Sequence, residues 1–226
     1  MLLLAAVCLL AGCGGDPAAK TGFHEVNERR FFANSLGMQF VQLPGGDAWL
    51  GVWETRVADY AVFASATTNG WQAAWFQDTD RHPAVNVQWD DAQAFCAWLS
   101  RRERESGLLA DDEGYRLPTS SEWTAALDQA EPTDSGNFGP QLGSESFDRT
   151  NPVGSFPANS LGLHDLRGNV WEWCTAWPSE EGVGRILRGG GWRDAATDRE
   201  LIVTPKVSAE DYGFRCVLIL KRPAGP

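Results

Sequence analysis

The chain has 226 residues, which suggests one domain, or one domain with a tail. Its formal net charge of −11 repels phosphate backbones, so we expect no nucleic-acid partner. Eleven tryptophans and 24 glycines indicate a loop-rich fold held by aromatic side chains rather than a helical bundle.

The first thirteen residues are apolar and uncharged, and they are too few to span a hydrocarbon core of roughly 30 Å. They are typical of the apolar region of a signal peptide. Leu10-Ala-Gly-Cys13 resembles the lipobox of bacterial lipoproteins, in which Cys13 would carry the lipid anchor. Residues 14–30 are then expected to be a tether. The alternatives are an ordinary signal peptide or a buried strand.

Two segments of alternating polarity, 40–43 and 49–52, flank Pro44-Gly45-Gly46 and predict a hairpin. A short helix is expected over 57–64. The clearest helix begins at Asp90 and ends at Gly107. Its apolar face is formed by residues at helical spacing, namely Ala92, Phe95, Cys96 and Leu99.

Thr119 and Glu122 have the spacing of a capping box and predict the start of a third helix. No clear periodicity is present over 128–160. Strands are predicted over 185–187 and 214–220. Helices that come early, strands that come late and long irregular connections indicate an α+β fold.

Five cysteines are present, and Cys8 and Cys13 belong to the leader and the anchor. Cys96, Cys174 and Cys216 remain for an oxidising compartment, in which one disulfide is possible. Their spacing alone does not choose the pair, and it is too wide for a metal site.

Seven segments occur in one order and together resemble the sulfatase-modifying-factor, or formylglycine-generating-enzyme-like, family. The resemblance covers residues 31–221, leaves 222–226 as a tail, and implies a loop-rich domain with C-type-lectin-like topology. The segments are Asn34-Ser-Leu-Gly-Met-Gln-Phe-Val41, Val85-Asn-Val-Gln-Trp-Asp-Asp-Ala-Gln-Ala-Phe-Cys-Ala-Trp-Leu99, Arg116-Leu-Pro-Thr-Ser-Ser-Glu-Trp123, Asn151-Pro-Val-Gly-Ser-Phe-Pro157, Gly162-Leu-His-Asp-Leu-Arg-Gly-Asn-Val-Trp-Glu-Trp-Cys174, Leu187-Arg-Gly-Gly-Gly-Trp192 and Gly213-Phe-Arg-Cys216.

The resemblance implies a disulfide between Cys96 and Cys216, which match a paired couple in the family's enzymes. Cys174 would then be the odd thiol, buried beside Trp171 and Trp173. The alternative for Cys174 is a reactive or intermolecular thiol.

The resemblance also implies structural calcium, bound through oxygen ligands. One site would use the side chains of Asp165 and Glu172 with the carbonyl groups of Gly168 and Val170. The alternative is that Asp165 caps a turn and Glu172 pairs with an arginine such as Arg188. A second, weaker site would use Asn137 and Glu145 with the carbonyl groups of Phe138 and Phe147.

The family's enzymes oxidise a substrate cysteine with Cu(I) held by two thiolates, because soft sulfur suits this ion. The matching positions in this chain are Asp194 and Arg199, and no cysteine lies between Cys174 and Cys216. Copper is therefore not expected. Iron, which a related branch binds through three histidines, is not expected either, since the only histidines are His24, His82 and His164.

We expect a membrane-anchored, non-catalytic binding or scaffold module in the bacterial cell envelope, on the periplasmic or outer face. Its groove would be lined by Trp192, Asp194 and Arg199 and would take a protein, peptide or glycan ligand. The alternative is an oxidoreductase of the family, acting on protein thiols in sulfatase maturation or with other chemistry. That alternative requires Asp194, Asp198, Arg199 and Cys174 to share one pocket.

Overall fold

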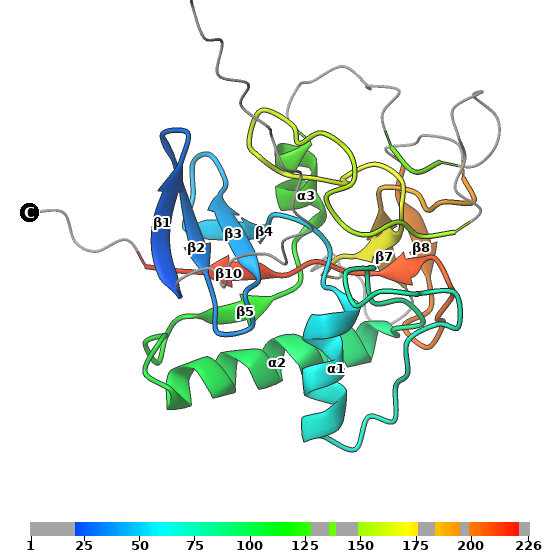
Figure 1. Cartoon of the computed structure of the whole chain (residues 1–226), viewed down its shortest axis with the longest axis horizontal. Coiled ribbons are helices and arrows are strands. Elements are labelled where there is room, and N and C mark those ends of the chain that lie inside the picture. Colours follow the sequence, from blue (N-terminus) through cyan, green and yellow to red (C-terminus); the bar gives the residue numbers. More distant parts are fainter. Residues whose placement is uncertain (1–20, 128–135, 139–148, 176–183, 195–198, 222–226) are drawn as a thin grey trace, which may run out of the picture.

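The computed structural model describes residues 21–127, 136–138, 149–175, 184–194 and 199–221 (Figure 1). Its first half holds β1 (Gly22–Val26), β2 (Arg29–Ala33), β3 (Gln39–Gln42), β4 (Ala48–Gly51), α1 (Val57–Ala66), α2 (Trp89–Glu105), β5 (Gly114–Arg116) and α3 (Ser120–Ala126). The remaining elements are β6 (Trp171–Trp173), β7 (Arg185–Arg188), β8 (Leu201–Val203), β9 (Tyr212–Gly213) and β10 (Val217–Ile219).

Six strands form one sheet in the order β1-β2-β3-β4-β10-β5, and every pair in it is antiparallel. Over β2, β3, β4 and β10 this sheet has buried side chains on both faces, since successive side chains of a strand point to opposite sides. Phe32, opposite Phe40, faces one core cluster, whereas Phe31, opposite Val41, faces the other. The last strand continues the pattern with Leu218 and Val217.

Helices cover the two faces. α1 and α2 supply Tyr60, Phe63 and Phe95 to the first cluster. α3 supplies Trp123 to the second. In Figure 1, α2 lies below the six-stranded sheet and α3 lies above it. This arrangement confirms the predicted α+β class.

A second sheet contains β8, β7, β6 and β9 in that order. β6 pairs in parallel with β9, and the other two pairs are antiparallel. Parallel pairing brings Trp171 opposite Tyr212, although 41 positions separate them in the sequence. β7 and β8 lie on the side of the molecule away from β1 and β2 (Figure 1).

The tether was predicted over residues 14–30, but the second half of that segment belongs to the fold. Residues 22–30 do not connect an anchor to the domain, because they form β1 and the start of β2 at the edge of the six-stranded sheet. Asn27 and Glu28 have positive φ angles of 50° and 62° and form the two-residue turn between the strands. Asn-Glu lacks the glycine that usually marks such a turn, so the hairpin has no strong sequence signal.

The predicted hairpin and the three predicted helices are confirmed as β3–β4, α1, α2 and α3. Gly107 follows α2 with a φ angle of 76°, as expected for a glycine that ends a helix. Thr119 caps α3 through its hydroxyl group, which accepts a hydrogen bond from the backbone N–H of Glu122 at 3.1 Å. β7 and β10 correspond to the two predicted strands, whereas β1, β2, β5, β6, β8 and β9 were not predicted.

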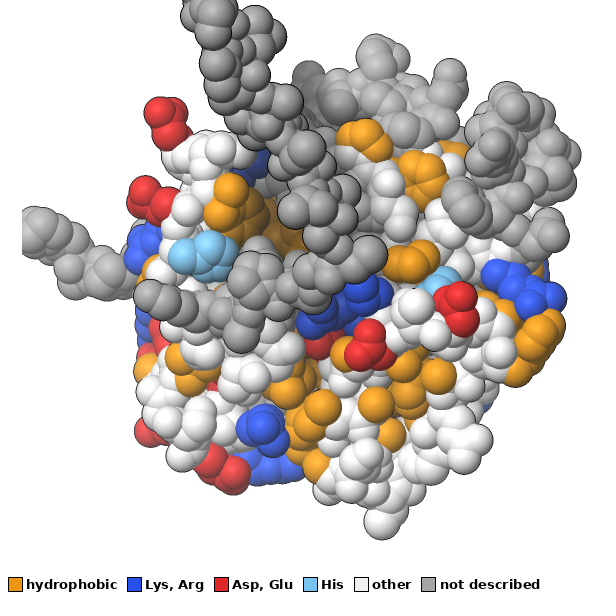
Figure 2. Space-filling model, viewed as in Figure 1, with side chains coloured by type: hydrophobic (Ala, Val, Ile, Leu, Met, Phe, Trp, Pro, Cys, Tyr) orange, Lys and Arg blue, Asp and Glu red, His pale blue; other side chains and the backbone are white. Residues whose placement is uncertain are grey.

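Acidic and basic side chains are interspersed on the face in Figure 2, and apolar side chains gather over α1. Among the described residues, no helix combines the length and the apolar character that a bilayer crossing requires. The predicted signal peptide and Cys13 lie outside the described residues.

Candidate functional site

A cavity of about 470 Å³ opens beside the second sheet. Residues from β6, β8 and β9 form its wall together with residues that follow β7. The lining residues are Trp171, Arg193, Asp194, Arg199, Glu200, Leu201, Ala209, Asp211 and Tyr212. Asp194 and Arg199, the two positions predicted to mark the groove, therefore share one cavity.

A glycine turn positions Asp194. Gly189 and Gly190 have positive φ angles, which a residue with a side chain rarely adopts. The turn places the backbone N–H of Gly191 3.1 Å from Asp194 Oδ2, and the indole Nε1 of Trp171 donates to the same oxygen at 2.7 Å. Asp194 therefore links the turn after β7 to β6.

Asp211 is the most enclosed carboxyl group of the cavity, with 7% of the residue exposed. Its pKa is raised, first by burial and also by the carboxylates of Asp194 and Glu210, against the opposing effect of Arg193. Two charged residues of the wall, Arg193 and Glu200, have partners of their own. Arg193 pairs with Glu210 at 2.6 Å, and Arg188 pairs with Glu200 at 2.9 Å.

Trp192, which was predicted to line the groove, lies next to the cavity but is not among its lining residues. Its indole Nε1 donates to the carbonyl oxygen of Glu210 at 3.4 Å. Its ring contacts Phe76, and the guanidinium group of Arg193 lies over its face. Cys174 does not line the cavity either, and Asp198 lies outside the described residues.

A cluster of buried charges lies between the two sheets. Arg215 and Glu172 are both fully buried and form a two-pronged ion pair at 2.6 and 2.7 Å. Arg215 also donates to the carbonyl groups of Gly51 and His164. The alternative for Glu172, pairing with an arginine, is therefore present, with Arg215 in place of Arg188.

Glu54 is a second buried carboxyl group in this cluster, and only one of its two oxygens has a hydrogen-bond partner. Its Oε1 accepts from Asn169 Nδ2 at 3.0 Å, whereas its Oε2 has no hydrogen-bond partner. The pKa of Glu54 is well above its usual range because of burial and the nearby carboxylates of Asp165 and Glu172, which together outweigh Arg215. The cluster thus holds more acidic groups than Arg215 alone can balance.

The ion pair bears directly on the first predicted calcium site. Asp165 lies close enough to Glu172 and Arg215 for their charges to affect its pKa, and its Oδ2 accepts from the N–H of Gly154 at 2.6 Å. Glu172, however, uses both oxygens for Arg215 and also accepts from Trp123 Nε1 at 3.1 Å. Both Glu172 oxygens are thus engaged by protein donors in this structure. Calcium at the oxygens of Asp165, Glu172, Gly168 and Val170 stays a prediction.

The second predicted calcium site is only partly described, because Glu145 and Phe147 lie outside the described residues. Asn137 and Phe138 are buried. Asn137 donates through Nδ2 to the carbonyl oxygen of Arg149 and to Asn169 Oδ1, and its Oδ1 has no partner. Across the described part of the chain, no group of three or more His, Cys, Asp or Glu side chains is placed to hold a metal ion.

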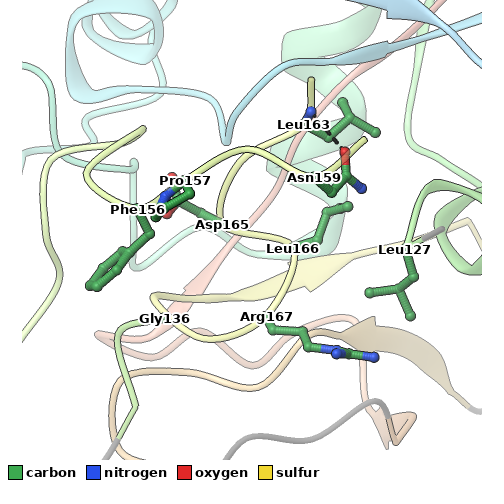
Figure 3. A pocket seen from close by; sticks show the side chains of 9 residues that line it. All are labelled: Leu127, Gly136, Phe156, Pro157, Asn159, Leu163, Asp165, Leu166 and Arg167. Carbon is green, nitrogen blue, oxygen red and sulfur yellow. Dashed lines mark hydrogen bonds between the residues drawn. The ribbon is translucent and has the colours of Figure 1, made fainter. Parts of the chain in front are cut away.

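A smaller cavity of about 70 Å³ lies next to Asp165 (Figure 3). Its lining is mixed, because the apolar side chains of Leu127, Phe156, Leu163 and Leu166 alternate with polar groups such as Asp165. It has room for a few water molecules, which makes it a poor candidate for a ligand site beside the larger cavity.

The three remaining cysteines are buried thiols. Cys96 on α2 and Cys216 before β10 place their sulfur atoms 3.7 Å apart, which is a contact between thiols and not a covalent bond. Their disulfide stays a prediction. Cys174 packs in the second core cluster, whereas Trp171 and Trp173 pack in the first, and burial raises the pKa of its thiol.

The two side-chain contacts of His82 could not be predicted from the sequence. His82 Nδ1 lies 2.9 Å from Thr150 Oγ1, and His82 Nε2 lies 3.1 Å from Asp78 Oδ1. The order resembles a hydroxyl, imidazole and carboxylate relay, but Thr150 is only 4% exposed and does not present its hydroxyl group to a substrate. The contacts instead fasten two connecting segments to each other.

Comparison with known families gives one extensive match. A family model described as sulfatase-modifying factor enzyme 1-like domain matches residues 24–220. The formylglycine-generating enzyme of Thermomonospora curvata is 29% identical over 184 residues, which cover 62% of this chain and 56% of that protein. The inactive C-alpha-formylglycine-generating enzyme 2 of Bos taurus is 33% identical over 173 residues, which cover 63% and 52%. The chain thus spans about half the length of these curated relatives.

Solved structures agree on the fold. CarF is 25% identical with a TM-score of 0.61, and the match covers 77% of this chain and 87% of CarF. PvdO from Pseudomonas aeruginosa is 20% identical with a TM-score of 0.61, and the match covers 84% and 83%. These similarities confirm the predicted formylglycine-generating-enzyme-like fold with C-type-lectin-like topology.

Proposed function

Because this chain belongs to the sulfatase-modifying factor enzyme 1-like domain family, we propose that it is a non-catalytic member that binds a polypeptide in the 470 Å³ cavity. The family includes proteins named as inactive as well as proteins named as enzymes. One observation carries the proposal. The two positions that match the copper cysteines both line the cavity, and they hold Asp194 and Arg199.

Carboxylate and guanidinium groups cannot replace the soft sulfur ligands that Cu(I) requires. The three cysteines of the domain are buried, and Cys174 does not share the cavity with Asp194 and Arg199. The wall is nevertheless well suited to recognition, because it combines enclosed aromatic rings with charged groups. Tryptophan, tyrosine and arginine are enriched where proteins bind each other tightly.

The binding function is tested with the full-length chain as bait on an envelope extract, beside a variant that fills the cavity, Ala209→Trp. We expect specific partners to be retained by the wild type and lost from the variant. As a matched control, Ala110→Trp places the same side chain at an exposed position before β5. Partners that bind all three proteins equally would show that the cavity is not the binding site.

Catalysis is tested separately. The chain is loaded with copper and incubated with a cysteine peptide and oxygen, and aldehyde formation is followed by mass spectrometry. We expect no product above the level seen with free copper. Turnover that depends on the protein would overturn the non-catalytic part of the proposal.

We also propose that the domain is held at a bacterial membrane by a lipid on Cys13. The support is the sequence Leu10-Ala-Gly-Cys13 after an apolar segment. β1 begins at Gly22, so few residues separate that position from the fold. Labelled palmitate should be incorporated into the wild type but not into Cys13→Ser, and labelling of the variant would contradict the assignment. The lipid on Cys13 would carry two acyl chains, which are enough for stable attachment of the domain to a membrane.

A further inference from the structure

The connection that follows α1 contains the only Asn-Gly pair of the chain, Asn69-Gly70. The side-chain amide of an asparagine can react with the backbone nitrogen of the next residue. Glycine permits this reaction best, because it has no side chain to obstruct the approach and its backbone is the most adaptable. Every other asparagine of the sequence precedes a residue with a side chain.

The structure leaves the backbone of Gly70 open to this reaction. Gly70 is exposed and has a φ angle of 39°, and a Cβ atom placed on it would meet no atom beyond its chain neighbours within 4 Å. Within the described part of the chain its backbone N–H donates no hydrogen bond, so no acceptor holds the nitrogen in place. The exposed position also admits water, which is the second reactant.

The side-chain amide of Asn69 fastens two elements to each other. Its Nδ2 atom donates to Asp91 Oδ1 at 2.9 Å, and the backbone N–H of Asn69 donates to Thr67 Oγ1 at 3.4 Å. Asp91 lies in the first turn of α2. The amide therefore ties the connection after α1 to the start of α2 through a hydrogen bond to a charged group.

Asn159 shows how the fold restrains another asparagine. Its Oδ1 accepts from the backbone N–H groups of Leu161 and Leu163, both at 3.0 Å, and its Nδ2 donates to the carbonyl group of Ala126 at 2.8 Å. Both ends of this amide are thus held, and Ser160 rather than glycine follows it. Asn159 is therefore an internal reference for the reactivity of Asn69.

We propose that Asn69 is a site of spontaneous deamidation. The backbone nitrogen of Gly70 bonds to Asn69 Cγ and closes an imide ring, while the bond from Cγ to Nδ2 breaks and ammonia leaves with the proton of the Gly70 N–H. Water then opens the ring at either carbonyl group, which gives aspartate or isoaspartate. The product carries a carboxylate in place of the donor to Asp91, so two like charges meet and the connection is released from α2.

The reaction is tested by incubating the full-length chain in detergent at mildly alkaline pH, followed by tryptic digestion and mass spectrometry. Cleavage after Arg56 and Arg81 isolates Asn69 from every other asparagine. We expect this peptide to gain the mass of an amide-to-acid conversion while the peptide that contains Asn159 stays unchanged, and enzymatic methylation should detect isoaspartate. Gly70→Ala should slow the conversion several-fold. Equal rates at Asn69 and Asn159, or in the wild type and Gly70→Ala, would overturn the assignment.

The structural consequence is tested with Asn69→Asp, which mimics one product. We expect its thermal midpoint to fall by about 2–4 °C, as for the loss of one hydrogen bond to a charged group. Gln72→Glu makes the same change of net charge at an exposed position of the same connection and should unfold like the wild type. Equal midpoints of the two variants would overturn the release from α2, whatever the rate of deamidation.

Discussion

At the scale of single residues, Arg215 carries the most demanding electrostatic role. It is fully buried, and its charge is matched by the two-pronged contact with Glu172. Replacing it by methionine would leave Glu172 buried without its partner. We expect Arg215→Met to lower the free energy of unfolding by about 3–5 kcal/mol, measured by chemical denaturation.

Arg193 provides the matched comparison, because its ion pair with Glu210 is exposed on both sides. Arg193→Met should change stability by less than about 1 kcal/mol. Equal losses in the two variants would mean that burial does not govern the strength of these pairs.

Glu103 gives a prediction for pH. It is fully buried on α2, its Oε1 accepts from the N–H and hydroxyl groups of Ser35, and its Oε2 has no partner. Burial raises its pKa above 4.5 despite the hydrogen bonds from Ser35. The folded state thus retains a proton that the unfolded chain releases near pH 4.5, so this group destabilises the fold as pH rises from there to the raised pKa.

The variant Glu103→Gln keeps an acceptor for Ser35 and removes the titration. Its stability relative to the wild type should therefore increase as the pH rises above about 4.5 and level off above the raised pKa. Denaturation curves at several pH values measure this difference. A difference that falls or stays constant with pH would contradict the raised pKa.

Single-residue roles were only partly predictable from the sequence. Asp194 and Arg199 were located through the family resemblance, and the cavity brings them together. Nothing local distinguishes Asp211, because its burial arises from the approach of Gly191 and from the parallel pairing of β6 with β9. The partner of Glu172 was likewise beyond sequence reasoning, since Arg215 is 43 positions away and Arg188 is a strand neighbour.

At the scale of elements, the β1–β2 turn contains a conformational cost. Glu28 has a φ angle of 62°, a region in which a side chain is disfavoured. Glu28→Gly should relieve that cost and raise the free energy of unfolding by about 0.5–1 kcal/mol.

The control for this change lies in the adjacent strand. Glu25 is exposed within β1, where glycine loses conformational freedom without any gain. Glu25→Gly should therefore destabilise the protein by about 0.5–1 kcal/mol. Changes of the same sign in the two variants would contradict the assigned role of the turn.

Elements with a strong local signal were the predictable ones. α2 has an apolar face and a terminal glycine, and α3 has a capping box. β5, β6 and β8 contain three residues each, which is too short for an alternating pattern to be recognised. Their pairing partners also lie far away in the sequence, so tertiary contacts rather than propensity define them.

At the scale of the whole molecule, Cys96 on α2 and Cys216 before β10 meet within the first core cluster. Their disulfide would close a loop of 120 residues, which stabilises by about 4–5 kcal/mol in the chain-entropy model. We expect oxidised protein to unfold at higher denaturant concentration than reduced protein, with a cross-linked peptide pair found by mass spectrometry.

The double variant Cys96→Ala/Cys216→Ala should show no dependence on reductant, and Cys174→Ala should behave like the wild type. A cross-link from Cys174 to either of the other cysteines would contradict the predicted pairing.

The described chain enters through β1 and leaves after β10, and both strands belong to the six-stranded sheet. The cavity lies beside the other sheet. In Figure 1 the strands β7 and β8 of that sheet are on the side of the molecule opposite β1 and β2. Attachment by either terminus, whether to a bead, a sensor chip or a fused carrier, would thus orient the second sheet away from the support. Immobilised protein should retain the same ligand affinity as protein free in solution.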